Sequence, residues 1–190
     1  MGVHVLATNL ASVGTGFEPQ RAHNFAVEFS GIPGPGDSDL LTLSIETATL
    51  PRCTNEPVTL PYGNEEVFVA GRARWEQGSM TLRDWIDRPV AQTLLNWRNI
   101  VYNPFTGSIG LATNYKKQAS IVLFGPNSQE GTPTYERVWK LVGVWPMDVS
   151  LASLDMSRND IVHITVVLRY DKAFPYVGSG VLGATTGLSF

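Results

Sequence analysis

Apolar and polar residues alternate most clearly near the end of the chain, in Asp160–Tyr170 (DIVHITVVLRY). Every second residue from Val162 to Tyr170 is apolar, so these side chains share one face of an extended chain. A repeat of two predicts a half-buried β-strand whose apolar face packs against the core. The opposite face of this strand carries His163, Thr165, Arg169, Ile161 and Val167.

Similar alternation predicts further strands, with a long irregular segment between two of them. Pro51, Pro57 and Pro61 all fall between Leu50 and Gly63, and proline lacks the backbone N–H that a ladder needs. We therefore expect this segment to be an extended loop without regular ladder pairing. The further strands are predicted at Asn24–Ser30, Leu40–Leu50, Glu65–Ala70, Arg74–Arg83, Lys117–Phe124 and Tyr135–Trp145.

Helical spacing occurs in one place along the chain. The apolar residues Val90, Leu94, Trp97 and Val101 are spaced so that they lie on one face of a helix. Asp87 stands where an N-cap residue would accept backbone N–H groups. Together, these patterns predict a mainly β protein, an antiparallel two-sheet sandwich or barrel with one flanking α-helix and extended terminal arms.

The two ends of the chain differ from its middle because residues 1–17 and 173–190 carry no charge. The first charged residue is Glu18 and the last is Lys172. We therefore divide the chain into an N-terminal arm (residues 1–22), a folded β domain (23–172) and an uncharged C-terminal arm (173–190). Glycines make the C-terminal arm costly to order, whereas its apolar residues make it costly to expose. We expect this arm to lie across a neighbouring subunit; a tail without fixed structure is the alternative.

Composition limits the classes of function. Charged residues are 16% of the chain, against about 25% in typical globular proteins, so we expect a larger assembly to cover much of the surface. A net charge of −3 argues against a surface that grips nucleic acid. Cys53 is the single cysteine and cannot form an intrachain disulfide. No apolar run approaches the roughly 18 residues of a transmembrane helix, and nothing in the sequence targets a membrane.

Motifs for catalysis are missing from the sequence: there is no nucleophile elbow, phosphate loop or paired CxxC motif. A hydrolase would need folding to bring His163 beside a carboxylate and a pocket. The five tryptophans leave another alternative, a β-sandwich carbohydrate-binding module with Trp75 and Trp139 exposed. We expect no catalytic residue, no metal ligand and no cofactor.

The order of these signals resembles the tail tube protein family of contractile-tailed bacteriophages and related contractile injection systems. The resemblance covers about Asn24 to Asp171. It rests on NFAVEFSGIP, on IETATLPRCTNEPVTLPYGNEEVFVAGRARWEQGSMTLRDW, on KKQASIVLFGP and on VWKLVGVWPMDVSLASLDMSRNDIVHITVVLRYD. It implies a structural protein that forms homo-hexameric rings, stacked into a tube with a continuous β-barrel lumen.

The resemblance also implies partners. The tail sheath protein would surround the tube and face the helix predicted at Arg88–Tyr102, and the tape-measure protein and passing DNA would fill the lumen. A baseplate and a tail terminator would close the ends. Such a protein belongs to the virion tail and is assembled in the host cytoplasm, without binding membranes itself. A tube-initiating baseplate homologue fits the same pattern.

Two sets of residues are candidates for these roles. We expect the first set on exposed sheet faces, some of them lining the lumen, with arginine paired to Glu76 or Asp84: Ser79, Thr81, Arg83, His163, Thr165 and Arg169. We expect the second set at contacts between subunits or rings: Pro51, Cys53, Pro57, Pro61, Tyr62, Phe174, Tyr176, Val181, Leu188 and Phe190.

Overall fold

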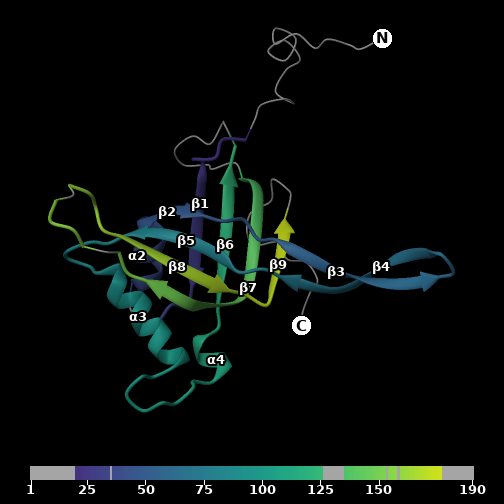
Figure 1. Ribbon diagram of the computed structural model, residues 1–190. Helices are drawn as coiled ribbons and strands as arrows, with labels where there is room; N and C mark the ends of the chain where they lie inside the picture. Colours follow the sequence, from purple (N-terminus) through teal and green to yellow (C-terminus); the bar gives the residue numbers. More distant parts are fainter. Residues whose placement is uncertain (1–19, 35, 126–134, 153, 158, 177–190) are drawn as a thin grey trace, which may run out of the picture.

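The computed structural model describes residues 20–34, 36–125, 135–152, 154–157 and 159–176. Most of its elements are strands (Figure 1). In chain order they are β1 (Phe25–Ser30), α2 (Asp37–Ser44), β2 (Ile45–Ala48), β3 (Cys53–Tyr62), β4 (Glu65–Trp75), β5 (Gly78–Arg83), α3 (Val90–Val101), α4 (Ala112–Tyr115), β6 (Lys117–Phe124), β7 (Tyr135–Ser150), β8 (His163–Arg169) and β9 (Lys172–Tyr176).

The strands form two antiparallel sheets that share β7, which confirms the predicted mainly β fold. The first half of β7 lies between β6 and β9, and β1 pairs with the far edge of β6; we call these four strands sheet A. The second half of β7 pairs with β8, followed by β5 and β2, and we call these sheet B. The remaining strands, β3 and β4, form a hairpin that projects from the body (Figure 1).

β7 passes from sheet A to sheet B at Gly143, which has a left-handed φ of 72°. Beside this turn, the Asp171 N–H donates to the Val142 carbonyl at 2.9 Å. The Asp171 carboxylate in turn accepts hydrogen bonds from Lys116 Nζ at 2.7 and 2.8 Å. A Cβ at position 143 would lie 2.3 Å from Asp171 Oδ2. Glycine is favoured here by the backbone angle, and a Cβ would also displace the end of the Asp171 side chain.

The hydrophobic core lies between the two sheets and is closed by the helices. Sheet A contributes Val27 and Ile121, and sheet B contributes Ile164, Val166 and Leu168, all almost fully buried. The helices add Leu41 from α2, and Val90, Leu94 and Trp97 from α3.

Trp97 is the largest fully buried side chain and fixes α3 to the body. Its ring packs edge-on against Phe29 of β1, with 6.1 Å between ring centroids. Its Nε1–H donates to the carbonyl of Tyr115 at 2.8 Å, which satisfies the one polar atom of the ring.

The strand predicted at Asp160–Tyr170 and the helix are confirmed, with shifts at their ends. β8 begins at His163, and its face of Ile164, Val166 and Leu168 is buried as expected. The expected N-cap is wrong: Asp84 rather than Asp87 accepts the backbone N–H of Ala91, at 3.3 Å. β7 also runs farther than predicted, through Pro146 to Ser150.

The prediction of one strand over Leu40–Leu50 is wrong in its first half. Residues up to Ser44 belong to α2, and only Ile45–Ala48 are extended. Hydroxyl groups bond back along the helix, from Ser44 Oγ to the Leu40 carbonyl at 2.6 Å. Leu41 is fully buried, whereas Leu43 is exposed, so the apparent alternation did not mark one buried face.

The expectation of an unpaired loop over Pro51–Gly63 is also wrong. Residues Cys53–Tyr62 form β3, which pairs with β4 along its length and has a register shift between Asn55 and Pro57. Prolines fit because each strand of a two-stranded hairpin has one open edge, where no N–H is needed. The predicted strands Glu65–Ala70 and Arg74–Arg83 are wrong in their bounds, because β4 is continuous to Trp75 and β5 begins at Gly78.

The beginning of the expected C-terminal arm belongs to the body. Ala173–Tyr176 lie in β9, which pairs with β7 of the same chain, and Ala173 is buried in the core. Residues 1–19 and 177–190 lie outside the described part of the chain, so most of both expected arms stays a prediction.

Replacing Gly143 by alanine should destabilise the fold. We expect Gly107→Ala, at a φ of 69° with open space around it, to cost about 1 kcal/mol of unfolding free energy. Gly143→Ala also displaces the end of the Asp171 side chain from Lys116, so it should cost somewhat more, roughly 2 kcal/mol. Urea unfolding of both variants measures the difference, and equal losses would contradict the role given to the Asp171 contact.

Candidate functional site

Sheet B presents a polar face on the side away from the core. Its register places one row of hydroxyl groups across four strands: Thr47 of β2, Thr81 of β5, Thr165 of β8 and Ser150 of β7. The predicted surface residues Ser79, Thr81, Arg83, His163 and Thr165 all lie on this face, and Arg169 lies near the turn of β7, opposite Trp145. Most exposed side chains of this face are polar or charged; Val167 of β8 is apolar, and so is Met147 at the register shift of β7.

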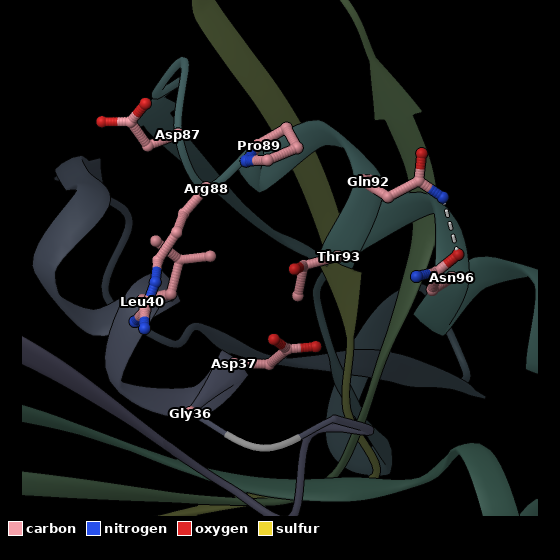
Figure 2. A pocket seen from close by; sticks show the side chains of 9 residues that line it. All are labelled: Gly36, Asp37, Leu40, Asp87, Arg88, Pro89, Gln92, Thr93 and Asn96. Atoms are coloured by element: carbon pink, nitrogen blue, oxygen red, sulfur yellow. Dashed lines mark hydrogen bonds between the residues drawn. The ribbon is translucent and has the colours of Figure 1, made fainter.

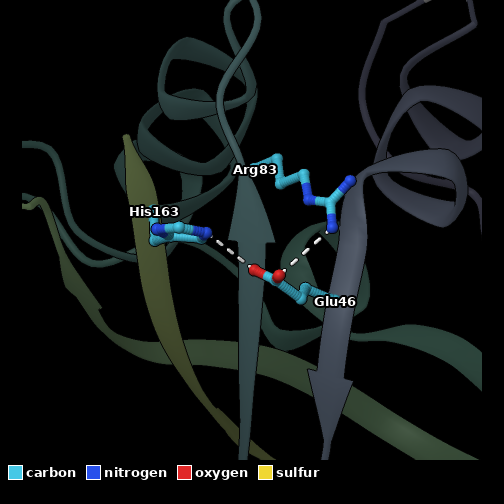
Figure 3. A network of polar contacts seen from close by, with 3 residues as sticks. All are labelled: Glu46, Arg83 and His163. Carbon is cyan, nitrogen blue, oxygen red and sulfur yellow. Dashed lines mark hydrogen bonds and ion pairs between the residues drawn. The ribbon is translucent and has the colours of Figure 1, made fainter. Parts of the chain in front are cut away.

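A shared carboxylate occupies one end of this face (Figure 3). Glu46 Oε1 accepts a hydrogen bond from Arg83 Nη2 at 3.1 Å, and Glu46 Oε2 lies 2.8 Å from His163 Nε2. Glu46 reaches both side chains because β2 has a register shift between Ile45 and Thr47. The negative charge of Glu46 offsets the positive charge of Arg83, so the polar face carries no isolated cation at this end.

The expected partners of Arg83 are therefore wrong. Glu76 instead forms an ion pair with Arg52 at 3.6 Å, at the base of the hairpin. Asp84 accepts the backbone N–H groups of Trp85 and Ala91 near the start of α3. The sequence contained no local signal for Glu46, because 37 positions separate it from Arg83 and the contact depends on strand pairing.

His163 has a neighbouring carboxylate and a cleft of about 300 Å³, which is part of what a hydrolase would need. The rest is missing from the part of the chain that the structure describes. No hydroxyl or thiol group there is hydrogen-bonded to His163, and the carboxylate is shared with Arg83. The described residues also include no cluster of three or more possible metal ligands.

The hairpin of β3 and β4 is the second notable feature, because both of its faces are exposed. Its register places Leu60 opposite Val67 and Val58 opposite Val69, with Tyr62 near the turn. These five side chains therefore share one face of the hairpin, and each is about half exposed or more. Burial in the subunit does not explain this apolar face.

Some of the predicted contact residues lie in or beside this hairpin, and the others lie in β9 or outside the described residues. Cys53, Pro57, Pro61 and Tyr62 lie in β3 and are exposed, and Pro51 precedes the strand. Phe174 is half exposed in β9, and Tyr176 ends that strand. Val181, Leu188 and Phe190 lie outside the described residues.

The residues between α3 and α4 form an exposed surface that the sequence patterns did not reveal. We call Tyr102–Leu111 the α3–α4 loop. Phe105 is 94% exposed and Ile109 is 79% exposed, although short-range hydrogen bonds hold the loop in shape. A usable signal was the turn sequence NPFTGS, in which the apolar Phe105 stands among turn-forming residues.

A groove of about 330 Å³ separates the first turns of α2 and α3 (Figure 2). Asp37, Asp87 and Arg88 lie around it, with the amide side chains of Gln92 and Asn96 on α3. Gln92 Nε2 donates to Asn96 Oδ1 at 2.9 Å.

The described helices include none long and apolar enough to cross a membrane.

The tryptophans do not form the exposed platform that carbohydrate binding would need. Trp75 is half-buried against Tyr170, with 6.2 Å between ring centroids, and Trp139 packs against the core. The hydroxyl group of Tyr170, the partner of Trp75, is buried, and this burial raises the pKa of Tyr170. Trp85 is half exposed, but its Nε1–H donates to Ser44 Oγ at 2.8 Å.

Comparison with protein families matches residues 21–173 to the model of the T4-like virus tail tube protein gp19. The tail tube protein gp19 of Enterobacteria phage T4 is 25% identical over 155 residues, which are 80% of this chain and 88% of that protein.

The fold is also found in solved structures, among them the following two. A chain of the PVC sheath–tube complex, an extracellular contractile injection system in its extended state, has a TM-score of 0.63 at 14% identity, over 91% of this chain and 99% of that chain. A chain of the anti-feeding prophage baseplate has a TM-score of 0.62 at 17% identity, over 84% and 97% of the two chains.

Removing the charge of Glu46 should have a measurable but small effect. Because these side chains are between a third and a half exposed, we expect Glu46→Gln to lower the unfolding free energy by about 0.5–1 kcal/mol. The loss should shrink at high salt, because salt screens exposed ion pairs. Urea unfolding at two salt concentrations measures it, with Glu66→Gln on the hairpin as a control, and a salt-independent loss would argue against an ionic contribution.

Proposed function

The chain belongs to the family of T4-like virus tail tube proteins (gp19), and from this premise we propose that six copies form a ring and that rings stack into a hollow tube. Membership of this family makes the chain a structural subunit of a tail tube rather than an enzyme. The hexameric ring, the lumen and its cargo are the proposed parts.

The observation that carries the proposal is the open, four-stranded sheet B with its polar face. Among the described strands, β2 has no partner on one side, and the second half of β7 has none on the side opposite β8. Unpaired strand edges invite pairing with another chain, and a closed barrel removes them. Joining β2 of one copy to β7 of the next would extend sheet B around a ring, with the polar face inside.

The chemistry of this face fits a channel through which DNA slides. Each contact between a cationic side chain and a phosphate holds the DNA, so a channel works best with few free cations. Here, hydroxyl groups form the row from Thr47 to Ser150, and Glu46 balances Arg83. We place Ser79, Thr81, Arg83, His163 and Thr165 on the lumen side, and Arg169 near it.

The proposed partners follow from this orientation. With sheet B inside, α2 and α3 lie toward the outside, where the tail sheath protein would contact the groove at Asp37, Asp87 and Arg88. The tape-measure protein and DNA would occupy the lumen, and a baseplate and a terminator would cap the tube. We place the protein in the virion tail and its assembly in the host cytoplasm.

A tube-initiating baseplate homologue is the second candidate, because a baseplate chain has nearly the same TM-score as the sheath–tube chain. Antibody labelling of intact particles distinguishes the two roles. Label along the whole tail indicates the tube subunit, whereas label at one end indicates the initiator.

Electron microscopy of the purified protein tests the assembly. We expect rings, or hollow tubes built from rings, at high protein concentration, because a contact between unlike surfaces repeats without closing. A protein that stays monomeric at the highest attainable concentration would contradict the proposal.

Adding a cation to the hydroxyl row should make the tube retain DNA. We expect tubes of Thr165→Lys to bind double-stranded DNA in a salt-dependent manner, with affinity falling as salt rises. Electrophoretic mobility measures binding, with Thr165→Gln as an uncharged control of similar size. Binding by Thr165→Gln as strong as that of Thr165→Lys would show that charge does not govern passage.

A further inference from the structure

We propose that His163 makes the retention of DNA in the channel depend on pH, because protonation of its imidazole adds an uncompensated positive charge to the polar face of sheet B. This inference rests on the proposed function, since it takes this face as the lining of the lumen. In a ring, every copy would add one such charge at the same level of the channel. The ligand that would respond is the phosphate backbone of double-stranded DNA.

The other ionised groups on this face cancel one another. Among the described residues, the acidic groups are Glu46 of β2 and Asp148 of β7. The basic groups are Arg83 of β5 and Arg169 of β8. Two negative and two positive charges sum to zero, and a neutral imidazole adds nothing to this sum. The charge of the face is therefore set by the protonation state of His163.

His163 shares its neighbouring carboxylate with a guanidinium group (Figure 3). Glu46 Oε2 lies 2.8 Å from His163 Nε2, and Glu46 Oε1 accepts a hydrogen bond from Arg83 Nη2 at 3.1 Å. Because Glu46 already offsets the charge of Arg83, a proton on His163 brings a second cation to the same carboxylate. One of these two positive charges then remains available to a phosphate group.

Further carboxylates lie near His163 at this end of the sheet. Asp155 and Asp160 line the same cleft as His163. Asp155 accepts hydrogen bonds from the backbone N–H of Ser157 at 2.9 Å and from its hydroxyl at 2.8 Å, and these bonds lower the pKa of Asp155. Asp84 accepts backbone N–H groups near the start of α3. These acidic groups are a constant background, to which His163 adds one positive charge per copy.

The pH range follows from the chemistry of the two kinds of side chain. An imidazole group gains its proton between about pH 8 and about pH 5, whereas carboxylates in general stay ionised down to about pH 5. The side chain of His163 is 39% exposed, so its charge can act on a ligand in the lumen. We therefore expect weak retention of DNA at about pH 8 and stronger retention at about pH 5.5.

Co-sedimentation of DNA with assembled tubes tests the inference. Tubes of the full-length chain are formed at about pH 8, divided between about pH 8 and about pH 5.5 at the same low salt concentration, and mixed with linear double-stranded DNA. The same DNA as a closed circle is a control for binding outside the tube, because a circle has no end that could enter the lumen.

Two variants isolate the titrating group. His163→Gln removes the proton-dependent charge and keeps a hydrogen-bond donor for Glu46. His23→Gln, at an exposed histidine that precedes β1, is the matched control. A third variant, His163→Lys, places a positive charge at the same position at both pH values.

We expect wild-type tubes and His23→Gln tubes to bind linear DNA roughly tenfold more tightly at about pH 5.5 than at about pH 8, with the gain falling as salt rises. His163→Gln should abolish this gain, and His163→Lys should bind linear DNA tightly at both pH values. A gain that persists in His163→Gln, or a closed circle bound as tightly as linear DNA, would overturn the inference.

Electron microscopy of the same samples separates this inference from the proposed function. Tubes whose DNA binding does not change with pH would reject the role of His163 and leave the tube intact. The absence of rings and tubes would reject the proposed function, and the inference with it.

Discussion

A sixteen-residue strand can serve two differently directed sheets only if it bends, and β7 bends at Gly143. The left-handed backbone angle at this glycine turns the chain from sheet A into sheet B, and Asp171 occupies the space that any side chain there would need. Lys116 holds the Asp171 carboxylate in place. The direction of sheet B depends on this turn. The orientations of the polar face of that sheet and of the hairpin that leads into β5 depend on this turn as well.

The sequence predicted the sheet faces better than it predicted the boundaries of the elements. The alternation in β8 identified the buried Ile164, Val166 and Leu168 because one face of that strand packs on the core. The prediction of a strand at Leu40–Leu50 was wrong because Leu41 and Leu43 are two residues apart but lie in different environments in a helix. The prolines of β3 led to the opposite error, the prediction of a loop where there is a strand, because a projecting hairpin has open edges that tolerate proline.

The candidate site shows a similar division. The strand period placed Thr81, Thr165 and His163 on an exposed face without any knowledge of pairing. The Glu46 carboxylate could not be predicted as their neighbour, because a register shift in β2 brings it there. The α3–α4 loop was missed for another reason: its shape comes from backbone hydrogen bonds across the loop, to which hydrophobic periodicity does not respond. Contacts that arise from pairing or turns thus require the fold.

The exposed apolar face of the hairpin bears on both the stability of the subunit and the proposed assembly. The body has its own core and its own bend, and neither involves the outer half of β3 and β4. An apolar face that the subunit cannot cover is unfavourable in water, and the chain carries few charges to keep such surfaces apart. Burial of this face against another chain would convert this unfavourable exposure into binding energy. A contact between two different surfaces of identical chains can repeat from copy to copy instead of closing in a pair. A tube requires a contact of this kind.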